Sequence, residues 1–79
     1  MKPTIRIRGE SFDRAREAAG LASTADLARA MRMHPTSVGR TLKGEHEVGT
    51  DFVAGALAAL PDYTFDHLFV VARPASVPA

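Results

Sequence analysis

The chain has 79 residues, of which 46% are hydrophobic and 24% are charged, and this composition is typical of one small globular domain rather than a disordered chain. It contains no cysteine, which excludes a disulfide framework and a thiolate metal site. Nine basic and four acidic residues through Lys43 give the first part a charge of +5, whereas one basic and five acidic residues after Lys43 give the rest −4. This asymmetry indicates a polyanionic partner for the first part, with two differently charged solvated surfaces as the alternative.

The sequence has no apolar run near the ~20 residues that span a bilayer, and residues 1–8 lack the apolar segment of a signal peptide. We therefore expect a cytoplasmic protein with no membrane partner. No internal repeat or linker divides the chain, so residues 1–73 are predicted to form one domain. Residues 74–79 show no hydrophobic periodicity and are predicted to be a flexible tail.

The first elements are predicted to be a short strand and a helix. Thr4–Arg8 alternates apolar or β-branched residues with basic ones, which is typical of a strand. Ser11 is expected to cap a helix that runs to about Ala19, where Gly20 ends it. Arg16 is expected to point outward or to lie along the edge of this helix.

Two short helices are predicted next, with almost no chain between them. The stretch Ser23–Asp26 is close to a capping box, so a helix should begin there and run to about Met31. A third helix should begin with His34 as its N-cap and Pro35 in its first turn, and end at Lys43. So short a connection forces the two axes to cross sharply, and both helices then need further helices to bury their apolar faces.

The rest of the chain is predicted to form a fourth helix, one helical turn and a strand. Thr50 is expected to cap the fourth helix, which Pro61 stops. One turn over residues 64–68 precedes a β-branched strand, Phe69–Ala72.

The two predicted strands can pair as an antiparallel ribbon. Such a ribbon is marginal alone, so it needs apolar side chains packed on the helices, namely Ile5, Ile7, Phe69 and Val71. The alternative is that the exposed strand edge pairs with a second subunit.

Leu27–Gly44 resembles the helix-turn-helix of the lambda-repressor and Cro-like (XRE) family. Ala28 is small where two such helices approach each other, and apolar residues provide the packed side. The stretch contains no acidic residue but four basic ones. Two departures are an arginine, Arg32, in the turn where the family often has glycine, and Thr41 where a larger apolar residue is common. If Arg32 is left-handed, it costs on the order of 1 kcal/mol relative to glycine.

The resemblance implies a mainly α fold of five helices, with the helix-turn-helix over about residues 24–43 and the recognition helix over about residues 35–43. Pro35, Thr36 and Ser37 would then meet base edges or the nearest phosphates. Arg40 would read a base, since guanidinium binds guanine bidentately. The alternatives are that Thr36 and Ser37 satisfy free N–H groups of their own helix, and that Arg40 is a solvated surface residue.

The same resemblance implies phosphate contacts at the edges of the motif. Lys43 and the loop after it would touch phosphate. Thr24, at the start of the second helix, is expected to cap that helix first and to help hold a phosphate second. Arg6 and Arg8 would add phosphate contacts if the strand places them well.

These residues lead to one functional expectation and one rival. We expect sequence-specific binding of double-stranded DNA by a small transcriptional regulator of bacterial or phage type, acting as a repressor and dimerising on a palindromic operator. The rival is a protein-interaction module, such as an antitoxin or adaptor. The three histidines have no metal-ligand spacing, and nothing orients a catalytic triad, so we expect no enzyme activity, cofactor, metal or small-molecule substrate.

Overall fold

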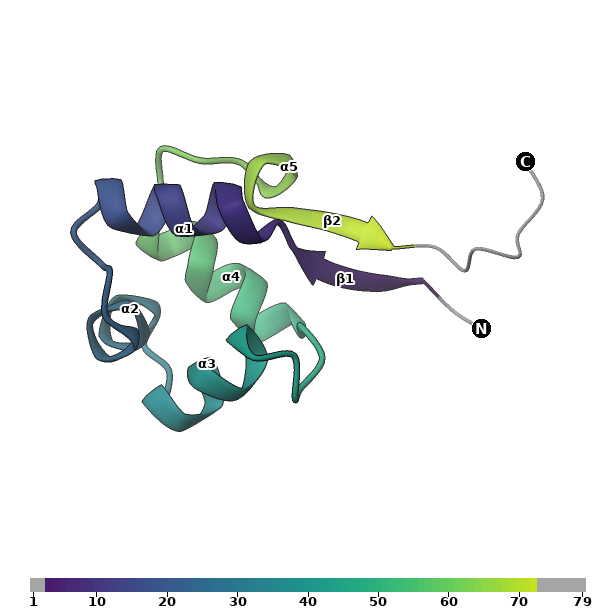
Figure 1. Ribbon diagram of the computed structural model, residues 1–79, viewed down its shortest axis with the longest axis horizontal. Coiled ribbons are helices and arrows are strands. Elements are labelled where there is room, and N and C mark those ends of the chain that lie inside the picture. Colours follow the sequence, from purple (N-terminus) through teal and green to yellow (C-terminus); the bar gives the residue numbers. More distant parts are fainter. Residues whose placement is uncertain (1–2, 73–79) are drawn as a thin grey trace.

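The computed structural model describes residues 3–72, and these form a mainly helical fold with one small two-stranded sheet (Figure 1). In chain order the elements are β1 (Thr4–Ile7), α1 (Gly9–Ala18), α2 (Thr24–Met31), α3 (Pro35–Leu42), α4 (Thr50–Ala59), α5 (Phe65–Leu68) and β2 (Phe69–Ala72). Every predicted element is present, and most bounds agree within one or two residues. The flexible tail predicted for residues 74–79 lies outside the described residues.

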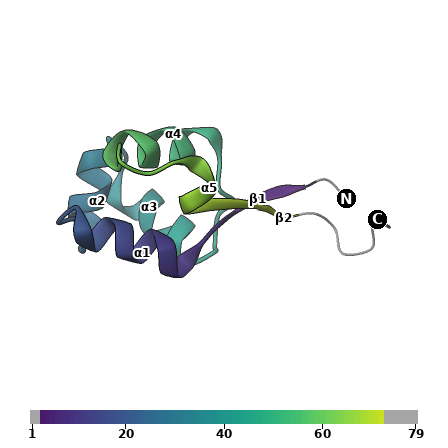
Figure 2. The ribbon, with the colours of Figure 1, turned by 90° about the horizontal axis from the view of Figure 1, so that it is seen from above.

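The two strands pair within the chain, as predicted. β1 runs antiparallel to β2, with Thr4 opposite Ala72 and Ile7 opposite Phe69. Figures 1 and 2 agree that this ribbon extends from one side of the helical body. It therefore brings the two ends of the described chain together away from α2 and α3.

Three phenylalanines from distant parts of the chain form the centre of the core. Phe12, Phe52 and Phe69 are fully buried, and their ring centroids lie 6.0–6.2 Å apart in stacked and edge-on pairs. Such aromatic pairs contribute about 0.5–1.5 kcal/mol beyond the area they bury. The cluster joins α1, α4 and the first residue of β2, so it attaches the ribbon to the helices.

Arg8 connects the ribbon directly to α1. Its N–H donates to the carbonyl of Leu68 (2.8 Å), and its carbonyl accepts from the N–H of Phe12 (2.8 Å), which is the first bond of the helix. The prediction that Ser11 would cap this helix is therefore wrong. Pairing with the end of α5 holds Arg8 in an extended conformation, and the helix begins immediately afterwards, at Gly9.

Arg16 is buried, although the sequence placed it outward or along the edge of the helix. Its guanidinium donates to the carbonyls of Leu21 (3.1 Å) and Ala22 (2.9 Å), and it lies 3.9 Å from a carboxylate oxygen of Asp13. A local pattern of charges did not reveal this contact because the carbonyl acceptors belong to the loop after α1. Arg16 thereby fixes the path of the chain from α1 to α2.

The prediction that Val71 packs on the helices is also wrong. Phe69 is buried, whereas Val71 is 45% exposed. Both side chains lie on one face of the ribbon, but Val71 is two residues further from the helical body. Ile5 and Ile7 of β1 are partly buried against the core, so in β2 the core packing is concentrated at the α5 end.

Helix α4 packs closely against α2. A Cβ placed on Gly55 would lie 3.0 Å from the carbonyl oxygen of Met31, so only glycine allows this approach without a shift. The N-cap of α4 is Gly49 rather than the predicted Thr50, which is the first helical residue. Asp51 Oδ1 accepts from the N–H of Phe52 (2.9 Å) in this first turn.

The described residues include no helix that is long and apolar enough to cross a bilayer.

Candidate functional site

The start of α2 is set by Ser23. Its Oγ accepts a hydrogen bond from the N–H of Asp26 (3.1 Å), as the near-capping-box sequence predicts. Thr24 does not cap the helix; it is the first helical residue, and its side chain is half-buried. The cap therefore leaves the Thr24 side chain available to line the neighbouring surface.

The turn after α2 contains an arginine in the left-handed conformation. Arg32 has φ 58° and ψ 41°. Its N–H donates to the carbonyl of Arg29 (3.1 Å), and the N–H of Met33 donates to the carbonyl of Ala28 (2.9 Å). These are the two bonds of a Schellman motif, which ends the helix and turns the chain sharply. This turn sets the direction in which α3 leaves α2.

His34 begins α3. Its Nδ1 accepts from the N–H of Thr36 (3.2 Å), and Pro35 occupies the first helical position, as predicted. The alternative prediction was that the Thr36 and Ser37 hydroxyls satisfy free N–H groups of the helix. His34 caps the helix instead. In the described chain neither hydroxyl takes part in a hydrogen bond with another residue.

The two sides of α3 differ in burial. Val38 is completely buried and Thr41 is nearly so. The Thr41 hydroxyl donates to the carbonyl of Ser37 (3.1 Å), so this buried polar group has a hydrogen-bond partner. The opposite side is exposed along the whole helix and carries Pro35, Thr36, Ser37 and Arg40. No other segment of the described chain covers this side.

A hollow of about 420 Å³ lies between α3 and the start of α2. It brings together five of the six predicted site residues, and its complete lining is Thr24, Pro35, Thr36, Gly39, Arg40, Lys43 and Glu45. Ser37, the sixth, is exposed but lies outside the hollow. Gly39 has room on its open side, because a Cβ there would meet only the Cγ2 of Thr24, at 3.9 Å.

Glu45 is the acidic residue that sequence reasoning missed in this hollow. Gly44 adopts φ +83° after α3, and the N–H of Glu45 donates to the carbonyl of Arg40 (2.9 Å). This second Schellman motif reverses the chain and returns Glu45 to the end of α3. The signal in the sequence was Gly44, a typical residue after a helix end.

Half of the eight basic side chains in residues 3–72 have an intramolecular partner, and the other half do not. Paired are Arg8 with the carbonyls of Asp66 and Phe69, Arg14 with Glu10, Arg16 with loop carbonyls, and Arg29 with Asp26. Within residues 3–72, Arg6, Arg32, Arg40 and Lys43 form no side-chain hydrogen bond or ion pair. Of these four, only Arg40 and Lys43 line the hollow.

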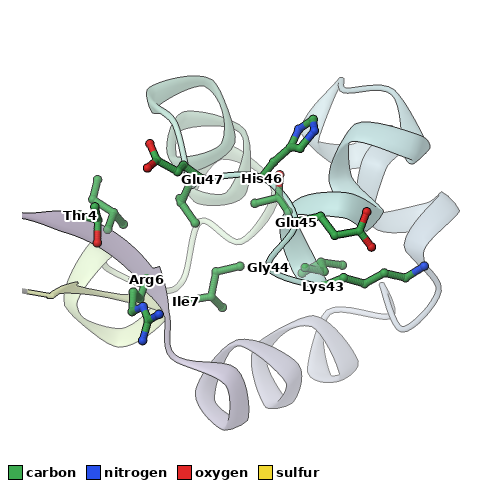
Figure 3. A pocket seen from close by; sticks show the side chains of 12 residues that line it. Thr4, Arg6, Ile7, Lys43, Gly44, Glu45, His46 and Glu47 are labelled. Atoms are coloured by element: carbon green, nitrogen blue, oxygen red, sulfur yellow. The ribbon is translucent and has the colours of Figure 1, made fainter.

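A second, larger groove of about 500 Å³ separates β1 from the chain that follows α3. Its walls include the aliphatic Ile5 and Ile7 and the charged Arg6 and Glu47 (Figure 3). This groove was not predicted, because it forms only where the ribbon passes the loop.

Lys43 and Glu45 line both depressions, whereas Glu47 lines only the larger groove. Figure 3 shows Lys43 and Glu45 reaching away from Arg6, whereas Glu47 points to the ribbon side. In the part of the chain that the structure describes, no three His, Asp or Glu side chains are arranged to hold a metal ion.

The geometry thus gives an open, basic helix face with one carboxylate at its end, next to the N-terminus of a second helix. Comparisons of this chain with protein-family models, with curated proteins and with solved structures give no match.

Proposed function

We propose that this protein binds double-stranded DNA in a sequence-specific manner, as a transcriptional regulator with a helix-turn-helix of the lambda-repressor type. In this proposal α3 enters the major groove, where an α-helix fits and each base pair presents a distinct pattern of donors and acceptors. The proposed regulator acts as a repressor by covering a promoter. No catalytic role is part of the proposal.

The observation that carries the proposal is the exposed side of α3. A helix face that packs inside a protein would be apolar, whereas this one carries Thr36, Ser37 and Arg40 and is open to solvent. Arg40 and Lys43 have no partner within residues 3–72, so their donors are available to guanine and to phosphate oxygens.

Two copies acting together would compensate for the small interface of one copy. A single module of this kind buries about 600–1,000 Å² of protein surface on DNA. We therefore propose that two copies occupy a palindromic operator whose half-sites are about one helical turn apart.

Salt-dependent DNA binding tests the proposal. Fragments selected from a random library by the purified protein should share a consensus, and log affinity for that consensus should fall linearly with log salt concentration, by about 0.9 for each phosphate contact. Arg40→Ala should lose about 5- to 150-fold of affinity for the consensus, the range for one good base contact, and far less for random DNA.

Arg14→Ala is the matched control, because it removes the same side chain from an exposed position on α1. It should leave both the consensus affinity and the salt slope unchanged. Binding without salt dependence, or no binding at all, would favour the rival protein-interaction module. Equal losses for Arg40→Ala on consensus and random DNA would make Arg40 a phosphate contact.

A further inference from the structure

The hollow beside α3 contains one residue that a purely electrostatic DNA surface does not need. Glu45 shares this hollow with Arg40 and Lys43, and it is the only acidic residue in its lining. The turn at Gly44 brings it there, through the hydrogen bond from its N–H to the carbonyl of Arg40. Its backbone position is therefore fixed by the helix end rather than by a loose loop.

The carboxylate of Glu45 is not used to orient its basic neighbours. Among residues 3–72, Glu45 forms no ion pair within 4.0 Å and no side-chain hydrogen bond, although Arg40 and Lys43 line the same hollow. Its side chain is exposed, and Figure 3 shows it reaching in the same direction as Lys43. Both oxygens are thus free to accept hydrogen bonds from a bound molecule.

A carboxylate facing DNA has only one favourable type of partner. Near phosphates it is repelled, whereas at a base edge in the major groove it can accept a hydrogen bond from the N4 amino group of cytosine. Adenine also presents an amino group, but its neighbouring N7 acceptor repels a carboxylate, which has no donor to offer.

We propose that Glu45 reads a cytosine in the operator, which makes it a specificity-determining residue next to Arg40. This inference rests on the proposed function. It names the composition of part of the target: one C·G base pair read by Glu45 beside the guanine read by Arg40. It also explains why the Glu45 carboxylate lies on an otherwise basic surface: it helps the protein to distinguish one DNA sequence from another.

The test compares two variants that remove the same charge from the same loop. Glu45→Ala removes the proposed reader, and Glu47→Ala is the matched control, because Glu47 lines the ribbon groove and not the hollow. Each protein, with its folding checked by circular dichroism, selects fragments from a random DNA library. Its affinity is then measured for the wild-type consensus and for versions with each C·G pair replaced.

We expect the wild type and Glu47→Ala to prefer cytosine at one shared position by about 5- to 150-fold, and Glu45→Ala to lose that preference at that position only. An unchanged consensus for Glu45→Ala would overturn the inference. So would an equal gain in affinity for every sequence, because the carboxylate would then act only by repelling phosphate. Either result leaves DNA binding itself intact, whereas absence of salt-dependent binding by the wild type would overturn the proposed function as well.

Discussion

Arg32 is the only non-glycine residue with positive φ among residues 3–72. Its Cβ is crowded in this left-handed conformation, and the conformation costs on the order of 1 kcal/mol relative to glycine. The side chain is exposed and has no partner within the described chain, so little in the folded state offsets this cost. A strained residue retained at a tight turn is typical of a position where the side chain has a use.

Arg32→Gly should therefore raise the free energy of unfolding by about 1 kcal/mol, because glycine removes the strain at the turn. Urea denaturation of the two proteins would measure this difference. Arg14→Gly, which places glycine within exposed α1, should instead lower stability by a similar amount, through the poor helix propensity of glycine. A loss of stability for Arg32→Gly would mean that the Arg32 side chain makes a stabilising contact that offsets its strain.

At the scale of elements, Phe69 is the one fully buried residue of the ribbon among the described residues. Phe69 is fully buried and its ring lies 6.0 Å from Phe12 and 5.4 Å from Phe65 between centroids. Val71, two residues along the same strand, is 45% exposed. The strand is therefore stabilised at its α5 end by core packing and beyond it by the ladder with β1.

Phe69→Ala should lower the free energy of unfolding by about 3–5 kcal/mol, because it leaves a cavity among the aromatic rings. For a chain of this size the total stability is about 4–12 kcal/mol, so this loss is a large fraction of the total and should clearly lower the melting temperature. Val71→Ala is the control on the same strand and should change stability by less than about 0.5 kcal/mol. Thermal melts followed by circular dichroism would show the contrast, and similar losses for both variants would show that core packing in β2 is not concentrated at the α5 end.

The order and type of the elements were predictable because local signals agreed with the tertiary fold. His34 and Pro35 marked the start of α3, and the alternation at Thr4–Ile7 marked β1. Contacts between distant segments were not predictable from local patterns. The start of α1 depends on pairing between Arg8 and Leu68, and the burial of Arg16 depends on the direction of the following loop.

The candidate site was also predictable only where local patterns determine it. Helical periodicity separates the exposed Thr36 and Arg40 from the buried Val38, whereas the resemblance to helix-turn-helix proteins placed Pro35 in the site. Glu45 was missed because it lies beyond the helix, and only the reversal at Gly44 returns it to the hollow.

At the scale of the whole molecule, the proposed pair of copies makes a geometric prediction. Two half-sites with centres 10–10.5 base pairs apart lie on one face of the duplex, so two copies bound there can touch each other. Mobility-shift titrations should show that the second copy binds at least about fivefold more tightly than the first. Inserting five base pairs between the half-sites moves them to opposite faces and should remove this gain.

A duplex with a single half-site provides the control, because its affinity should match the first binding step on either palindrome. Equal cooperativity with both spacings would indicate that the two copies associate before they bind DNA. Their contact would then have to allow one copy to rotate relative to the other. Absence of cooperativity with the shorter spacing would mean that the protein acts as independent monomers.

The position of Phe69 in the chain also determines how the protein is made. The Phe69 carbonyl accepts from Nε of Arg8, 61 residues earlier in the chain, and Phe69 leaves the ribosome after Phe12 and Phe52. A nascent chain that contains only the four long helices therefore exposes one side of two aromatic rings. Because closing so long a loop is slow compared with forming helices, the ribbon should be the last part to form, and the unfinished intermediate should be the species most prone to aggregation.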